Sequence, residues 1–89
     1  MKQNKISVLI PTLNTKKLLV QCIEHLKKST RLPLEIIVLD LGNDGSDKWC
    51  IKNKIKVFRK EVPFYFAQSC NFLASQATGD ILLFLNSDT

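Results

Sequence analysis

The stretch LEIIVLDLGNDGSD (residues 34–47) joins an apolar run to a polar turn, and this junction decides the fold. The run from Ile36 to Leu39 is apolar and closes on Asp40. A short apolar run without polar alternation is typical of a strand that is buried on both faces, as in a parallel sheet. The glycine, asparagine, aspartate and serine residues that follow predict a turn.

Three further segments of the chain predict strands. KISVLIP (residues 5–11) is apolar and β-branched, and we expect Pro11 to end it. IKVFRK (residues 55–60) alternates apolar and basic residues, which favours a strand near a sheet edge. DILLFLN (residues 80–86) is apolar throughout, which favours a central strand.

Helical patterns lie between these strands. The first can be capped by Asn14 or Thr15 and is broken before Pro33, and Gly79 is placed to cap the C-terminus of the last. A short helix or an irregular crossover is expected around residues 47–52. Two sets of apolar residues recur at helical spacing: Leu18, Leu19, Cys22, Ile23 and Leu26, and then Phe66, Cys70, Leu73, Ala74 and Ala77.

The alternation of strands and helices predicts the α/β class, as one unit with a parallel sheet and right-handed connections. Ligands of open α/β sheets bind outside the carboxyl ends of the strands. Polar residues follow every predicted strand at that edge: Thr12 and Asn14, Asp40, Arg59 and Lys60, and Asn86 and Asp88. We therefore predict a ligand site there, although DLGNDGSD can also be read as a plain turn.

Asn86 and Asp88 stand two residues apart just beyond the last predicted strand. In an extended segment both side chains point to the same side, where hard oxygen ligands suit Mg²⁺ or Mn²⁺. The alternative is an aspartate that caps a following turn. No Ser/His/Asp or Cys/His arrangement can be built, and His25 is assigned to the surface.

The chain carries 13 basic and 8 acidic residues, a formal charge of +5, and much of the excess lies in residues 52–60. This basic run is either a solvated strand or a surface that attracts phosphates or an anionic membrane. No aromatic residues interleave with the basic ones in a way that suggests base stacking, so nucleic acid is not expected as a partner. The three cysteines form no metal-binding pattern and are expected to be buried free thiols. No apolar run approaches the ~20 residues of a membrane span, which favours the cytoplasm and leaves attachment at the inner membrane face open.

SVLIPTLN, EIIVLDLGNDGS and AQSCNFLASQATGDILLFLNSDT together resemble the N-terminal half of the family 2 glycosyltransferases. The resemblance runs from about Ile6 to the last residue. It implies a Rossmann-like GT-A nucleotide-binding half with helices on both faces of the sheet, so that residues 1–89 form a partial domain. It also implies an inverting enzyme that transfers a sugar from a nucleotide-diphosphate sugar to the hydroxyl of a glycan or lipid-linked acceptor.

The resemblance assigns roles to matching positions only. Pro11, Thr12 and Asn14 match the loop that meets the nucleotide, and Asp40 matches the residue that hydrogen-bonds its base or ribose. Asn71 and Gly79-Asp80 match the segment that leads into the last strand. The metal-binding element of the family, DxD, is matched by Asn86 and Asp88, with Asp88 as the carboxylate of a Mg²⁺ or Mn²⁺ ion beside the diphosphate.

The sequence departs from the family pattern in three places. The turn reads DLGNDGSD where the family often reads DNGSTDGS, and NSD stands for DxD, as in rhamnosyltransferase-like enzymes of cell-surface polysaccharide synthesis. No residue matches the catalytic base, so this chain alone is expected to be inactive. The alternative is a non-catalytic remnant or nucleotide-binding module, and an exposed apolar sheet edge would favour self-association.

Overall fold

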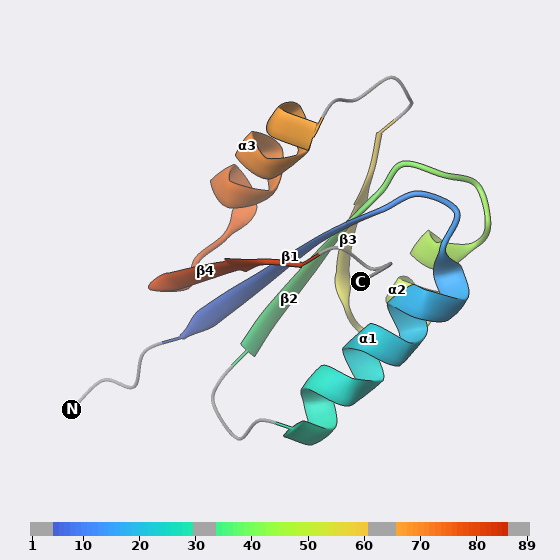
Figure 1. Ribbon diagram of the computed structural model, residues 1–89, viewed down its shortest axis with the longest axis horizontal. Helices are drawn as coiled ribbons and strands as arrows, with labels where there is room; N and C mark the ends of the chain where they lie inside the picture. Colours follow the sequence, from blue (N-terminus) through green and yellow to red (C-terminus); the bar gives the residue numbers. More distant parts are fainter. Residues whose placement is uncertain (1–4, 30–33, 61–65, 86–89) are drawn as a thin grey trace.

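The computed structural model describes residues 5–29, 34–60 and 66–85, and the side chains of residues 66 and 67 are not part of that description. Four parallel strands form one sheet in the order β3-β2-β1-β4. The elements along the chain are β1 (Ile6–Thr12), α1 (Lys16–Ser29), β2 (Leu34–Asp40), α2 (Ser46–Lys52), β3 (Lys56–Arg59), α3 (Phe66–Gln76) and β4 (Ile81–Phe84) (Figure 1). The predicted α/β class and the parallel sheet are confirmed.

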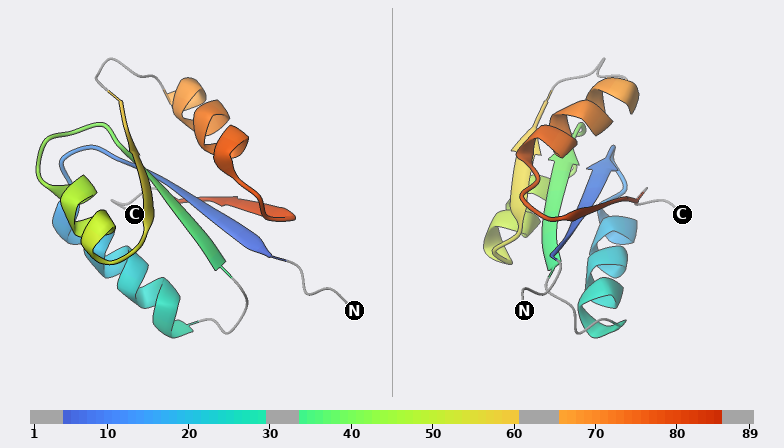
Figure 2. Two further views of the ribbon diagram at one scale, coloured as in Figure 1. Left: turned by 180° about the vertical axis from the view of Figure 1, so that it is seen from behind. Right: turned by 90° about the vertical axis from the view of Figure 1, so that its left-hand side faces the viewer.

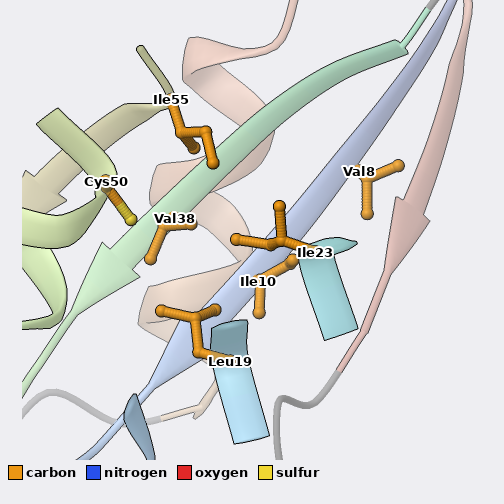
Figure 3. Packing of buried hydrophobic residues seen from close by; sticks show 7 residues of the cluster. All are labelled: Val8, Ile10, Leu19, Ile23, Val38, Cys50 and Ile55. Carbon is orange, nitrogen blue, oxygen red and sulfur yellow. The ribbon is translucent and has the colours of Figure 1, made fainter. Parts of the chain in front are cut away.

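The two faces of the sheet carry separate apolar clusters, because successive strand residues point to opposite sides. Val8, Ile10 and Val38 face α1 and α2, where Leu19, Ile23 and Cys50 complete a fully buried cluster (Figure 3). The alternate residues Leu9, Ile37 and Leu39 face α3 and pack against Leu73. Helices therefore cover both faces, as predicted, with α1 and α2 on one side and α3 on the other (Figure 2).

Pro11 does not end the first strand, contrary to the prediction. It lies inside β1 opposite Leu39, and the strand continues to Thr12. The carbonyls of Lys5 and Leu9 accept hydrogen bonds from Ile81 and Leu85, so this alternate set of β1 residues faces β4. Pro11 belongs to the same set, and β4 ends at Phe84, opposite Leu9. The missing N–H of Pro11 therefore removes no hydrogen bond between β1 and β2.

The prediction that the last strand is central is wrong for the described sheet. β4 pairs with β1 alone and forms one edge, while β3 forms the other edge, as predicted. The four residues of β4 are 41–46% exposed, although this strand is as apolar as β1 and β2. Neither helix layer covers it, because α1 and α2 pack over β1, β2 and β3 and α3 packs over β1 and β2. The expectation of self-association rests on this exposed strand.

Gly79 is not the cap of α3. The helix ends at Gln76, and Gly45 is the glycine with a positive φ in the described part of the chain. Gly79 is instead pressed against the start of β1, where a Cβ would come within 2.8 Å of the Lys5 carbonyl oxygen and 2.9 Å of the Ser7 nitrogen. Its N–H donates to the Ser7 hydroxyl at 2.9 Å. The absence of a side chain allows this close approach.

Glu35 anchors the same end of the sheet. Its carboxylate accepts hydrogen bonds from the Ser7 hydroxyl and from the N–H and hydroxyl of Thr78, at 2.9–3.0 Å, and Lys5 lies 3.8 Å away. Partial burial would raise the pKa of Glu35, but the bonds from Thr78 and Ser7 and the charge of Lys5 outweigh it and lower the pKa. This network joins β1, β2 and the connection from α3 to β4.

Asp44 holds the beginnings of two helices. One carboxylate oxygen accepts from the N–H of Lys16, the first residue of α1, at 2.8 Å. The other accepts from the N–H of Ser46, the first residue of α2, at 3.1 Å and from its hydroxyl at 2.7 Å. Thr15 occupies the cap position of α1, since its carbonyl accepts the first bond of the helix, from Leu19. The negative charge of Asp44 near the N-termini of two helices also interacts favourably with the positive ends of their dipoles.

Replacing Asp44 with asparagine is expected to destabilise the fold by about 1 kcal/mol, because the amide accepts at one atom only and leaves the N–H of Lys16 or of Ser46 without its acceptor. Burial alone would raise the pKa of Asp44, but the hydrogen bonds from Ser46 and Lys16 lower it overall. A lowered native pKa means that the stabilisation is complete above the unfolded pKa of about 3.9 and is lost as the pH falls through the native value. Urea unfolding of wild type and Asp44→Asn from pH 7 to pH 2 measures both effects.

The exposed Glu24 of α1 provides the matched control. Glu24→Gln should leave the unfolding midpoint nearly unchanged at pH 7. An Asp44→Asn variant that is as stable as Glu24→Gln would show that Asp44 does not hold the two helix ends.

Candidate functional site

The carboxyl ends of β1, β2 and β3 lie side by side at one edge of the sheet. Leu41 donates its N–H to the carbonyl of Thr12 at 2.9 Å, and Lys60 donates to the carbonyl of Asp40 at 3.2 Å. These bonds carry the strand pairing into the loops, so that the three chain segments leave the sheet together. The structure thus brings together three of the four strand ends at which the sequence predicted a ligand site.

The loops after β1 and β2 are locked to each other by Asn14. Asn14 has a φ of 52°, which an asparagine tolerates better than most residues. Its side-chain oxygen accepts from the N–H of Asn43 at 2.9 Å. Gly42 lies directly beneath it, where a Cβ would come within 2.7 Å of the Asn14 nitrogen. Only glycine fits at position 42 without moving the first loop.

Asp40 is fully buried below these loops, and both of its carboxylate oxygens are already in use. One accepts from the N–H of Gly42 at 2.9 Å, and the other from the N–H of Asp47 at 3.1 Å. Nη1 of Arg59 lies 3.5 Å from Asp40 and 3.6 Å from Asp47. The contacts of Asp40 therefore shape the turn, start α2 and hold Arg59 at the end of β3.

Cys50 packs beneath this acidic pair. Burial, and then the negative charges of Asp40 and Asp47, raise the pKa of its thiol to about 11. Such a thiol stays protonated at neutral pH and is a poor nucleophile. All three cysteines are free thiols, and Cys50 is the fully buried one.

A pocket of about 330 Å³ lies above the buried turn. Besides Gly42, its walls are two leucines, two amides and two cations: Leu13, Leu41, Asn14, Asn43, Arg59 and Lys60. The ammonium of Lys60 also lies 4.7 Å from the centre of the Phe72 ring, which in turn makes an edge contact with Phe58. Apolar walls, amides that can hydrogen-bond and two positive charges suit an anionic ligand with a flat apolar part.

The structure separates the predicted site residues into groups. Asn14 lines the pocket, while Thr12 is buried beside it and bonds Thr15 through the two hydroxyls at 2.9 Å. Pro11 lies within β1, and Asn71 is an exposed residue of α3 that is not part of the pocket wall. Asn86 and Asp88, the predicted metal ligands, lie outside the described residues.

The pocket side chains that the sequence did not single out are Leu13, Leu41 and Asn43. Arg59 and Lys60 were placed at the correct edge by their position after a strand, and that position was the available signal. No pattern in the sequence indicates that Asn43 would lie against Asn14. Within residues 5–29, 34–60 and 66–85, no three His, Cys, Asp or Glu side chains form a group that could hold a metal. No helix in these ranges has the length and apolar character needed to cross a bilayer.

Asp40→Asn is expected to destabilise the protein by about 2–3 kcal/mol, because an amide can accept at one atom only and leaves a buried N–H unsatisfied. Chemical unfolding measures the loss. The control is Asp80→Asn, since Asp80 is exposed and makes one long bond, of 3.2 Å, to the N–H of Lys5. Equal stability of the two variants would show that the turn does not depend on the Asp40 carboxylate.

A family model described as Glycosyl transferase family 2 matches residues 7–89 of the chain. Glycosyltransferase GlyG of Streptococcus pneumoniae serotype 4 is 37% identical to it, over 93% of this chain and 30% of the relative. The chain thus spans less than a third of the length of that curated relative.

Solved structures show the same arrangement of elements. Glucosyl-3-phosphoglycerate synthase from Mycobacterium tuberculosis, in complex with Mn²⁺, UDP and glucosyl-3-phosphoglycerate, matches with a TM-score of 0.76 and 25% identity, over 94% of this chain and 33% of the other. TarS of S. aureus matches with a TM-score of 0.75 and 27% identity, over 94% of this chain and 16% of TarS.

The mannosyltransferase PcManGT from Pyrobaculum calidifontis, in complex with GDP-Man and Mn²⁺, has a TM-score of 0.75 over 99% of this chain and 28% of its own. At 21% identity it supports the fold alone. The predicted Rossmann-like GT-A fold is confirmed by these neighbours. Because the family model covers nearly every residue, the chain belongs to glycosyl transferase family 2.

Proposed function

We propose that this chain is the donor-binding part of a glycosyltransferase that transfers a sugar from a nucleotide-diphosphate sugar to an acceptor hydroxyl. The observation that carries the proposal is the cationic, amide-lined pocket at the carboxyl edge of the sheet, in a chain of this family. Glucosyl-3-phosphoglycerate synthase, the structural neighbour at 25% identity, was solved with UDP, which supports a nucleotide donor. We infer a glycan or lipid-linked acceptor, as expected in cell-surface polysaccharide synthesis.

In this proposal each part of the pocket has a separate task. Leu13 and Leu41 flank the flat base, and Asn14 presents a side-chain amide to the base or ribose. Arg59 and Lys60 attract the negative charge of the donor, and Arg59 is held in place by Asp40 and Asp47. Asp40, which the family pattern assigns to the base or ribose, is fully buried with both carboxylate oxygens engaged, and in this proposal it acts through the turn that it holds.

The reaction expected of the complete enzyme is a single displacement with inversion. The acceptor oxygen forms a bond to the anomeric carbon while the bond from that carbon to the diphosphate oxygen breaks. The hydroxyl proton passes to a carboxylate base, and the electron pair leaves with the nucleoside diphosphate. No position in residues 1–89 matches that base, so we expect this chain to bind the donor without turning it over.

We propose Asn86 and Asp88, and none of the pocket residues, as the ligands of a divalent cation. The described pocket does not fit a metal by itself, since its polar side chains are amides and cations and the nearby Asp40 carboxylate is already engaged. The Mn²⁺ in two neighbouring structures supports a cation in relatives. Bound there, Mg²⁺ or Mn²⁺ would neutralise charge on the leaving diphosphate.

Lys60→Gln is expected to weaken UDP or GDP binding about fivefold, because one charge contact near the surface contributes about 1 kcal/mol. Isothermal titration calorimetry with each nucleotide measures the effect. Lys52→Gln, at the far end of α2, removes the same charge away from the pocket and should bind like wild type. Equal weakening by both variants would mean that the pocket does not hold the nucleotide.

Asp88→Ala is expected to abolish the part of nucleotide binding that depends on added Mn²⁺ or Mg²⁺, while metal-free binding persists. The titration is repeated with EDTA and with each metal. Unchanged metal dependence in Asp88→Ala would refute the assignment of Asp88 while leaving the pocket assignment intact.

A further inference from the structure

The outer side of α1 and α2 carries most of the positive charge of the chain. Four exposed lysines lie on α1, two on α2 and one in the turn after α2. In order, they are Lys16, Lys17, Lys27, Lys28, Lys48, Lys52 and Lys54. We call this set the lysine face.

The lysine face lies on one side of the sheet, because α1 and α2 both cover that side. Lys17 and Lys28 lie on the side of α1 opposite its buried residues, Leu19 and Ile23. The first turn of α1 reaches the beginning of α2, where Nζ of Lys16 would lie 3.6 Å from a Cβ placed on Gly45. Beyond that point both helices stay on the same side of the sheet, opposite α3 (Figure 2).

Acidic residues do not neutralise this surface. Asp40 and Asp47 face Arg59, Asp44 holds the two helix ends, and Glu35 is bonded at the amino edge of the sheet. Among the described residues, no ion pair joins a lysine of this face to a carboxylate. Glu24 is the one exposed acidic residue on α1 and α2.

An apolar side chain protrudes from the middle of the basic segment. Ile51 is 67% exposed and stands between Lys48, Lys52 and Lys54 in sequence. The neighbouring Trp49 packs inward against the core cluster, so it offers no platform for stacking bases. An aliphatic residue among lysines fits the boundary between lipid headgroups and acyl chains better than it fits a nucleic acid.

We propose that the lysine face docks on the surface of an anionic lipid bilayer, with Ile51 entering the headgroup region. Lysines near such a surface each strengthen binding about fivefold, and salt weakens the attraction by screening. Docking through α1 and α2 leaves the pocket at the carboxyl edge of the sheet available to a ligand. The proposal does not depend on what that pocket binds.

Co-sedimentation of the full chain with vesicles tests the proposal. We expect binding to vesicles of phosphatidylcholine with phosphatidylglycerol, no binding to phosphatidylcholine alone, and release by added salt. The triple variant Lys48→Gln, Lys52→Gln, Lys54→Gln should lose on the order of a hundredfold in partitioning. The same three positions changed to arginine keep the charge and should bind like wild type. If the glutamine variant does not keep the wild-type circular dichroism spectrum, Lys17→Gln with Lys28→Gln replaces it, with a smaller expected loss.

Ile51→Ser should weaken binding several-fold, whereas Leu82→Ser, a change at a 42% exposed residue of β4, should not. Failure of wild type to bind phosphatidylglycerol vesicles at low salt would overturn the proposal, as would glutamine variants that bind like wild type. Loss of binding in Leu82→Ser, but not in Ile51→Ser, would place the contact on β4 instead. Duplex DNA bound as tightly as the vesicles, with no effect of Ile51→Ser, would identify a general polyanion surface and also refute lipid docking.

Discussion

The carboxylate of Asp40 has to be satisfied inside the protein, because it has no exposed surface. Its partners are the N–H groups of Gly42 and Asp47 and the guanidinium of Arg59. Satisfying them requires the chain to turn sharply after β2, to begin α2 within a few residues, and to bring the end of β3 alongside. The hydrogen bonds of Asp40 hold this turn in place, and Asn14 and Asp44 make their contacts within it.

The same requirement accounts for the distribution of charge. Carboxylates are used where helices begin and strands end, because backbone N–H groups there lack partners within their own element. Asp40 and Asp44 are engaged in this way, and Glu35 accepts from the N–H of Thr78 at the opposite edge. The carboxylate of Asp47 pairs with Arg59. The lysines are left on the outside, so that both the pocket and the outer side of α1 and α2 are positive. An acidic count of 8 against 13 basic residues therefore understates how basic these two surfaces are.

Residue patterns were sufficient for most of the fold. The strands, the two main helices and the edge position of β3 follow from apolar spacing, because burial on one or two faces leaves a periodic signal. The sequence-based predictions were wrong where a tertiary contact overrides a local sequence preference. Pro11 stays in β1 because its missing N–H points toward the side of β4 at a position past Phe84, the last residue of that strand. Gly79 is needed for its close contact with β1 and does not end a helix. β4 reads as central, yet in the described sheet it lies at an edge.

The sequence by itself determined the alternation of strands and helices, the polar residues at the carboxyl edge and the likeness to family 2, since each of these is local along the chain. Only the tertiary structure decided that Asn14 meets Asn43, that Arg59 meets Asp40 and Asp47, and that Lys60 lies over Phe72. Only it shows that α1 and α2, which carry the exposed lysines, cover the same face of the sheet. These contacts join residues that are 12 to 29 positions apart, through strand order and helix rotation. No local pattern encodes these distances, because they depend on which strands pair and which faces are covered.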